Sequence, residues 1–187
     1  MRWNEGECNI KTKNNISVNN TVRLILLVVF ACFMLSCSSE KKGEPLKIGD
    51  RAPDFTVKDL DGSEITLSDY AGSPVILRFF LTDCKFCRAD TPVFNDYYDR
   101  YKSQGLKIIY LDSLGTDYSV LSAFKQELRI SFPIALDIGG RVSRNYKVKA
   151  LPQTIILDSQ HKIVSAVIGG VSEEELNSSL SQFVNAE

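Results

Sequence analysis

Three short and almost unbroken apolar runs set the pattern of this chain. They read VILRFFL at 75–81, LKIIYLD at 106–112 and TIILD at 154–158. Such runs are typical of central strands covered on both faces of a sheet, because a strand with one solvated face alternates apolar and polar residues. The sequence therefore predicts a buried sheet whose strands lie far apart in the chain.

Segments with helical periodicity lie between these runs. Apolar residues recur at three- and four-residue steps in two of them, which predicts amphipathic helices. The two sets are Phe86, Ala89, Val93, Phe94, Tyr97 and Tyr101, and then Val120, Leu121, Phe124 and Leu128. The alternation of strand and helix indicates an α/β fold with a mixed sheet layered between helices.

Local signals mark the ends of several elements. The pair Asp61-Gly62, between DFTV and EITL, predicts an N-terminal β-hairpin. Gly105 is expected to end the first helix. Ser172 and Glu175 form a capping box, which opens a last helix. The apolar residues expected on this last helix are Leu176, Leu180, Phe183 and Val184.

The N-terminal part has the features of an export signal. Residues 24–35 are twelve unbroken apolar residues after Arg23, which suits a signal-peptide core and is too short to cross a bilayer comfortably. The run ends in MLSCSSEKKGE, which resembles the lipobox of bacterial lipoproteins. In that motif the cysteine, here Cys37, is acylated after cleavage. A plain membrane anchor with an unmodified Cys37 is the alternative.

The expected parts of the chain are a signal peptide at 1–37, removed before Cys37, a flexible tether at 38–46, and one domain at 47–187. Both interpretations of the leader, the lipoprotein signal and the plain anchor, place the domain in the cell envelope, facing the periplasm or another extracytoplasmic space. The domain is long enough for one hydrophobic core. The formal net charge of −1 offers no attraction for nucleic acid.

Cysteine usage singles out one pair of residues. Of the five cysteines, Cys8 and Cys32 leave with the leader and Cys37 would carry lipid. Cys84 and Cys87 are then the only free thiols, in an oxidising compartment. They have only each other as partners.

The position of this pair indicates redox chemistry. Cys84 and Cys87 follow the apolar run at 75–81 and begin a helix at about Lys85. The first turn of a helix offers unpaired N–H groups and the positive end of the helix dipole, which stabilise a thiolate, the attacking form of the sulfur. We therefore expect Cys84 to be the nucleophile and Cys87, one turn along, to resolve a mixed disulfide. A structural bridge this local would constrain the chain little.

The chain resembles the thioredoxin-like, membrane-associated thiol-disulfide oxidoreductases of the TlpA and ResA type, in the AhpC/TSA and redoxin superfamily. The stretches that carry the resemblance are IGDRAPDFTVKDLDGSEITLSDYAGSPVILRFFLTDCKFCRADTPVF, GLKIIYLD, SFPIALD and ALPQTIILDSQHKIVSAVIGG. The resemblance implies a thioredoxin-like fold with a redox-active disulfide at Cys84 and Cys87. It also implies a cis proline at Pro152 facing the cysteines, and an acidic residue, Asp90, that assists proton transfer at the buried thiol. Pro92 matches the proline that kinks the active-site helix of that family.

The same resemblance implies partners and a direction. It favours reduction of protein disulfides, as in cytochrome c maturation, with apocytochrome c as one such substrate. Electrons would come from a membrane reductase that transports thiols. No cofactor is implied.

Two residues depart from the family pattern. Asp83 stands where a tryptophan usually precedes the first cysteine, and its carboxylate disfavours the thiolate of Cys84, whereas Lys85 favours it. Arg78 stands where thioredoxin has a buried acid and the lipoprotein relatives often have asparagine. Because a buried guanidinium needs a counter-charge, we expect Arg78 to pair with Asp90.

Three other functions use the same residues. A zinc clip needs about four ligands, but the mature chain offers two thiols and His161, which we expect to be exposed in the turn DSQHKI. A Sco-like copper-delivery module would space its cysteines by three and use a distant histidine. A peroxiredoxin-like thiol peroxidase shares the APDF opening, but its signature places proline and threonine ahead of the reactive cysteine.

Overall fold

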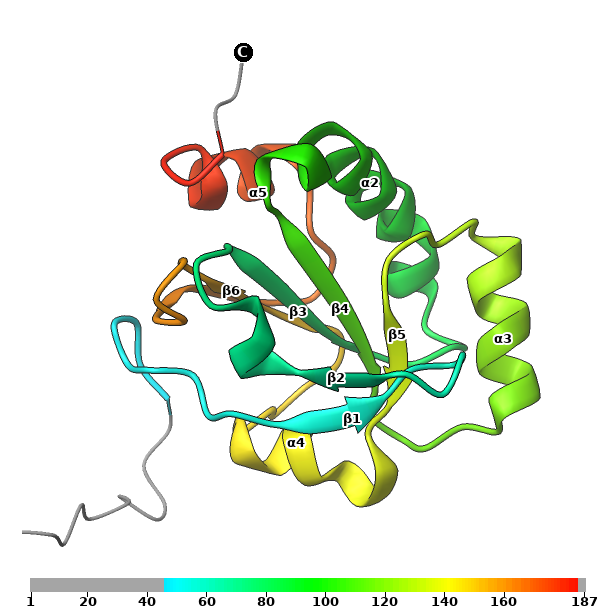
Figure 1. Ribbon diagram of the computed structural model, residues 1–187. Helices are drawn as coiled ribbons and strands as arrows, with labels where there is room; N and C mark the ends of the chain where they lie inside the picture. The colour runs from blue at the N-terminus through cyan, green and yellow to red at the C-terminus, as the bar shows by residue number, and fades with distance from the viewer. Residues whose placement is uncertain (1–45, 185–187) are drawn as a thin grey trace, which may run out of the picture. The chain divides into compact units, whose positions relative to one another are not determined.

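The computed structural model describes residues 46–184, which form a five-stranded mixed sheet with helices on both faces (Figure 1). The strand order is β5-β4-β3-β6-β7. Strands β3, β4 and β5 run parallel, and β6 and β7 are antiparallel to their neighbours. The bounds are β3 Val75–Phe80, β4 Lys107–Asp112, β5 Ile134–Leu136, β6 Gln153–Leu157 and β7 Ile163–Ile168.

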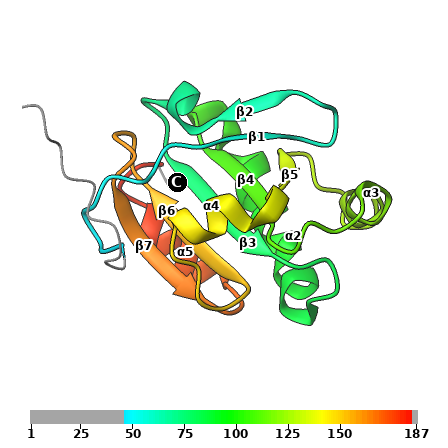
Figure 2. The same cartoon turned by 90° about the horizontal axis from the view of Figure 1, so that it is seen from below.

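Helices cover both faces of the sheet, which is seen most clearly in the view from below (Figure 2). Helices α2 and α5 lie on one face, with α3 beside the β5 edge, and α4 lies on the opposite face. The small antiparallel hairpin β1–β2 covers the α4 side and bridges to β5 through Asp59 and Ala135. The bounds are β1 Thr56–Lys58, β2 Glu64–Thr66, α2 Lys85–Tyr101, α3 Tyr118–Glu127, α4 Arg141–Asn145 and α5 Glu173–Leu180; three 3-10 turns are Leu67–Tyr70, Lys102–Gln104 and Ile138–Gly140.

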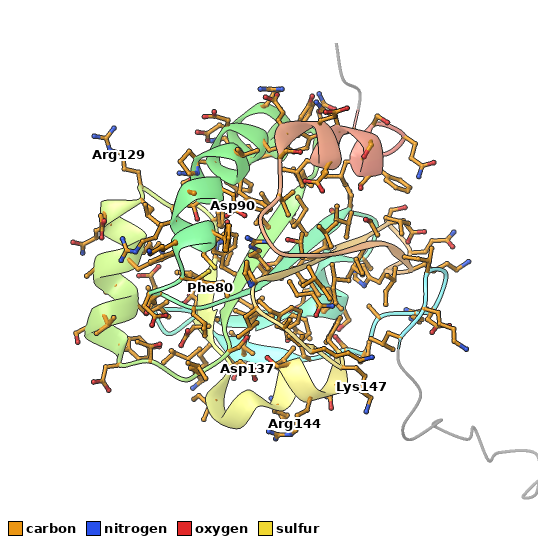
Figure 3. The ribbon with its side chains drawn as sticks, turned by 180° about the vertical axis from the view of Figure 1, so that it is seen from behind. Phe80, Asp90, Arg129, Asp137, Arg144 and Lys147 are labelled. Carbon is orange, nitrogen blue, oxygen red and sulfur yellow. The ribbon has the colours of Figure 1, made fainter. Side chains whose placement is uncertain are left out.

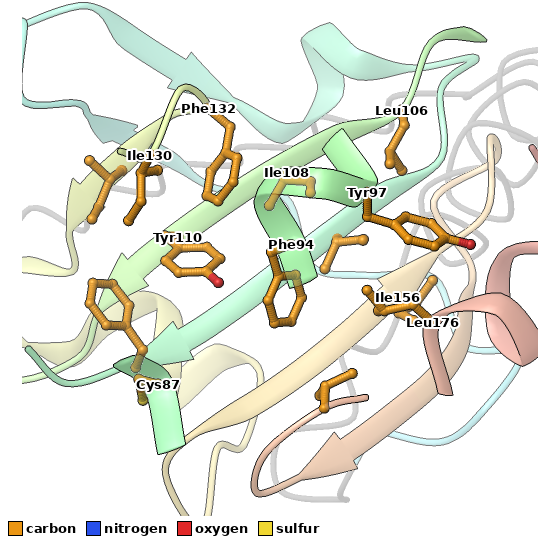
Figure 4. Packing of buried hydrophobic residues seen from close by; sticks show 14 of the residues in the cluster. Cys87, Phe94, Tyr97, Leu106, Ile108, Tyr110, Ile130, Phe132, Ile156 and Leu176 are labelled. Atoms are coloured by element: carbon orange, nitrogen blue, oxygen red, sulfur yellow. The ribbon is translucent and has the colours of Figure 1, made fainter. Parts of the chain in front are cut away.

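Every residue of β3 is buried, which explains why its sequence does not alternate. Its side chains point alternately into two apolar clusters. The cluster under α2 and α5 combines aliphatic and aromatic side chains, and the rings of Phe94, Tyr110 and Phe132 fill the space between helix and strands (Figure 4). The cluster on the α4 side is built around Phe79 and Tyr146. Sheet and helices therefore hold the loop after β3 on a rigid base.

Most of the predicted element ends are confirmed. Helix α2 begins at Lys85, and Gly105, with a φ of 97°, follows the 3-10 turn that ends it. Helix α5 opens on the capping box of Ser172 and Glu175. The hairpin around Asp61-Gly62 is also confirmed.

Three expectations about these elements need correction or addition. Helix α5 ends at Leu180, so Phe183 and Val184 pack after the helix rather than on it. Phe86 and Val120 were expected on the buried faces of their helices but are 65% and 45% exposed. The short elements β5 and α4 have too few residues to show a period and were not predicted.

The expected signal peptide at 1–37, the lipidation of Cys37 and almost all of the tether at 38–46 lie outside the described residues. Among the helices between residues 46 and 184, none has the length and hydrophobicity of a transmembrane span.

Candidate active site

The two cysteines sit where strand β3 gives way to helix α2, as the sequence predicts. Cys84 is the N-cap of α2, and its sulfur accepts a hydrogen bond from the backbone N–H of Cys87 at 3.4 Å. Both are free thiols; Cys84 is half-buried, whereas Cys87 is fully buried. Cys84 can therefore contact a partner molecule, whereas Cys87 is shielded from it.

Burial makes the two thiols chemically different. It raises the pKa of Cys87 to about 12, and a hydrogen bond with the Cys84 side chain acts in the same direction. A backbone hydrogen bond at Leu81 and the charge of Arg78 oppose this rise in pKa. At neutral pH, Cys87 therefore stays protonated until a mixed disulfide has formed at Cys84.

The Leu151–Pro152 peptide bond is cis, as the family resemblance implied. Pro152 precedes strand β6, whose first residue, Gln153, pairs with Phe79 of β3. The carbonyl of Pro152 accepts a hydrogen bond from the N–H of Gly169 at 2.8 Å. This register places Pro152 at the same end of the sheet as the cysteine loop.

The predicted pairing of Arg78 with Asp90 is confirmed. Arg78 points from the middle of β3 toward α2, and its Nη2 forms an ion pair and hydrogen bond with Oδ2 of Asp90. Asp90 lies on the side of α2 that faces the sheet (Figure 3). The two side chains are 0% and 7% exposed. Water therefore has little access to this pair.

Other groups complete the environment of the pair. Arg78 Nη1 donates to Thr154 Oγ1 at 2.6 Å and to the carbonyl of Gly169 at 3.1 Å. Asp90 Oδ2 also accepts from the N–H of Val171 at 3.0 Å. Burial raises the pKa of Asp90, while the charge of Arg78 and the Val171 N–H oppose that rise.

Sequence reasoning missed several of these contacts. Thr154 has no partner that the sequence can name; its position opposite Arg78 comes from the β3–β6 register. Thr91 Oγ1 donates to the carbonyl of Cys87 at 2.5 Å and lies 3.4 Å from the Tyr110 hydroxyl. A threonine inside a helix and a tyrosine inside an apolar run were the only signals available.

One expectation, about a residue in the turn at the other end of β6, was wrong. His161 was expected to be exposed, but it is only 4% exposed. The N–H of Ala52 donates to its carbonyl, and Gly72 N–H donates to the carbonyl of Ser159 in the same turn. Segments from the N-terminal part of the domain therefore cover this turn. By contrast, Asp83 and Lys85 beside the nucleophile are exposed.

The sheet order together with a dithiol at the first turn of α2 defines the thioredoxin-fold class of proteins. The chain belongs to the AhpC/TSA family, whose model matches residues 48–166, and within it groups with the ResA-type thiol-disulfide oxidoreductases.

Two curated relatives and two solved structures place the chain. It is 35% identical to the thiol-disulfide oxidoreductase ResA of Bacillus thuringiensis subsp. konkukian, over 91% of this chain and 98% of that protein. It is 31% identical to ResA of Geobacillus thermodenitrificans, over 87% and 93%. The thioredoxin domain of a thiol-disulfide oxidoreductase from Bacteroides vulgatus superimposes with a TM-score of 0.67 at 26% identity, over 75% of this chain and 99% of that one. StoA from Bacillus subtilis gives a TM-score of 0.60 at 25% identity, over 68% and 96%.

Proposed function

We propose that this chain is a lipid-anchored, extracytoplasmic thiol-disulfide oxidoreductase that reduces disulfides in partner proteins. The observation that carries the proposal is the asymmetry of the dithiol. Cys84 is accessible at a helix N-terminus, whereas Cys87 is buried, protonated at neutral pH and one turn away. This arrangement suits a nucleophile and a resolving thiol.

The reaction follows from this asymmetry in two steps. The thiolate of Cys84 attacks one sulfur of a partner disulfide, and the other partner sulfur leaves as a thiolate that takes up a proton. Cys87 then loses its proton and attacks the sulfur of Cys84. The Cys84–Cys87 disulfide forms, the partner leaves with both of its sulfurs reduced, and two electrons have passed to it.

Neighbouring residues have defined roles in this proposal. Asp90 lies one turn beyond Cys87 on the same helix face and would take up or return the proton of the resolving thiol. Pro152 would position the partner chain beside Cys84, because it lies at the same end of the sheet as the cysteine loop. No cofactor is needed, since the electrons reside in the two thiols.

The partners and location rest on the sequence and on the relatives. The apolar stretch at 24–35 and Cys37 support export and a lipid anchor at the cell envelope. A membrane reductase that transports thiols would return the oxidised pair to the dithiol. Oxidised protein thiols, such as those of apocytochrome c, are the proposed substrates.

A trapping experiment tests the protein-substrate claim. In the Cys87→Ala variant, the mixed disulfide at Cys84 cannot be resolved, so a partner protein should stay bound and be released by a dithiol. The Cys84→Ala variant is the matched control and should capture nothing. Failure of Cys87→Ala to hold any disulfide-containing protein, including a model apocytochrome, would contradict the claim.

The reduction potential tests the direction. A value near that of thioredoxin, about −270 mV, is expected for a reductant, whereas about −120 mV would indicate an oxidant. Peroxide consumption by the dithiol form, faster than its reaction with protein disulfides, would instead favour a thiol peroxidase.

A further inference from the structure

Arg78 is a fixed positive charge inside the domain, directly under the cysteine helix. It is fully buried, in the middle of β3. Its guanidinium contacts three other segments: Asp90 on α2, Thr154 on β6, and the carbonyl of Gly169 after β7. It also stacks over the ring of Phe94, with 5.1 Å from Cζ to the ring centroid. These contacts fix the position of the charge.

Fold stability alone does not explain such a pair. Taking two charges out of water costs several kcal/mol per ion, and apolar residues of similar volume are often as stabilising or more so. Most of the strand residues around Arg78 are apolar, and Leu77 and Phe79 beside it are fully buried. A charge kept at such a site, against the helix that carries the reactive thiols, points to a role in the chemistry.

Cys87 is the reactive group that shares a face of α2 with the counter-ion of this charge. Asp90, which holds the guanidinium, lies three residues beyond Cys87 on α2, and thus on the same helix face. Among the causes that set the pKa of Cys87, the charge of Arg78 is one of the two that lower it. In a buried environment a positive charge interacts more strongly with a thiolate than it does in water.

We propose that Arg78 is a positioning residue for the resolving half of the reaction, whose fixed guanidinium stabilises the thiolate of Cys87. The inference rests on the proposed function of the dithiol. In the forward direction, Cys87 releases its proton and its sulfur attacks Cys84, which expels the partner thiolate. In the reverse direction, a donor thiolate attacks Cys84 and the S–S electron pair leaves on Cys87. Cys87 carries negative charge in both.

Arg78 also ties the cysteine helix to the segment of Pro152. The Gly169 carbonyl accepts from Arg78, and the Gly169 N–H donates to the Pro152 carbonyl. Thr154, two residues after Pro152, is held by the same guanidinium nitrogen as the Gly169 carbonyl. A variant that removes the charge must therefore be separated from one that merely loosens these contacts.

The test measures the resolving step directly. Reduced protein is mixed with an aromatic disulfide reagent that releases thionitrobenzoate; attack by Cys84 gives the first coloured product, and attack by Cys87 on the resulting mixed disulfide gives the second. Below the pKa of Cys87, the second rate scales with its thiolate fraction, and a change of one pKa unit is tenfold in that fraction. Arg78→Gln is expected to slow the second phase by about tenfold and move its pH profile upward.

Three further variants separate charge from packing. Arg78→Lys keeps a cation and should stay within about threefold of the wild type. Thr154→Val removes one anchor of the guanidinium but keeps the charge, so its second phase should also stay within about threefold although the fold is destabilised. Arg88→Gln removes an arginine that follows Cys87 in the chain but whose side chain contacts Thr82, Glu127 and the ring of Phe124, and it should leave the rate unchanged.

A folded Arg78→Gln variant within about twofold of the wild type, or equal slowing by Thr154→Val, would overturn the proposal. If Arg78→Gln does not fold, a folded Arg78→Lys variant that is slower than Thr154→Val by about tenfold would overturn it as well. The reagent does not need a protein partner, so failure to trap protein substrates would refute the proposed function without affecting this result.

Discussion

Replacing Asp90 by asparagine should destabilise the domain far more than replacing an exposed carboxylate. The change leaves the guanidinium of Arg78 buried, at 0% exposure, without a counter-charge. Removal of one partner from a buried ion pair costs about 3–5 kcal/mol. The asparagine oxygen can still accept from the N–H of Val171, which Asp90 holds at 3.0 Å. We therefore expect a loss at the lower end, about 3 kcal/mol.

Equilibrium unfolding in urea, with the protein reduced and at pH 7, measures this loss as a shift of the midpoint at constant m-value. A loss of about 3 kcal/mol corresponds to a fall in Tm of roughly 6–12 °C for a domain of this size. The matched control is Glu127→Gln, which breaks the exposed pair with Arg88, whose side chains are 38% and 61% exposed. That change should cost at most about 1 kcal/mol.

A double variant tests the physical reason. If the loss comes from an unpaired charge, the neutral replacement Arg78→Gln with Asp90→Asn should recover at least half of it. Both charges are then gone, while the two amides can still pair with Thr154, the Gly169 carbonyl and the Val171 N–H. If the loss comes from packing, the double variant should be worse than Asp90→Asn. A loss below about 1 kcal/mol in Asp90→Asn itself would refute the argument, since it would mean that the pair is as well solvated as a surface pair.

Three other predictions concern the same region. Thr154→Val removes the 2.6 Å hydrogen bond to the charged guanidinium and should lower the free energy of unfolding in urea by about 1.5–3 kcal/mol. Thr66→Val, at an exposed hydroxyl pair, is the control and should cost little, and equal effects of the two changes would contradict a stabilising role for the Thr154 hydrogen bond. Burial raises the pKa of Cys87 from the ordinary 9.0 to about 12, so the unfolded thiol ionises first, and the stability of the reduced protein should fall with rising pH between these values by about 1.4 kcal/mol per pH unit. The Cys87→Ala variant should lack this component of the slope, and identical slopes would refute the pKa assignment. Phe94→Ala, at a fully buried ring 5.6 Å from Tyr110, should cost about 3–5 kcal/mol, and a change under about 1 kcal/mol in the urea midpoint would show that the ring is not part of the core.

The strands and helices that carry long patterns could be predicted, as could the short hairpin β1–β2 through its Asp61-Gly62 turn, but the short elements β5 and α4 could not. Strand β3 and helix α2 have enough residues for their apolar runs or periods to identify them. Strand β5, with three residues, and α4, with five, do not. Their structure depends on neighbours: β5 pairs with β4, and α4 begins where Asp137 accepts from the N–H groups of Val142 and Ser143.

Some features of the candidate site could likewise be predicted from the sequence, and others could not. The places of Cys84 and Cys87 at a helix start follow from local sequence, as does the possibility of a cis bond before Pro152. The exposure of Phe86 and the burial of His161 do not, because both depend on where other segments end or fold back. The pairing of Arg78 with Asp90 was accessible to sequence reasoning, since a buried cation needs an anion and few acids were close to the cysteines.

That a buried strand is followed by two thiols in the first turn of a helix can be predicted from the sequence, because strand burial and helix starts depend on residues that are neighbours along the chain. The surroundings of the buried thiol, in contrast, depend on the tertiary structure. Arg78 meets Thr154 and Gly169 across separations of 76 and 91 residues, and contacts of that range depend on sheet order and register. The electrostatic environment of Cys87 therefore depends on the fold, whereas its position on the helix follows from the local sequence.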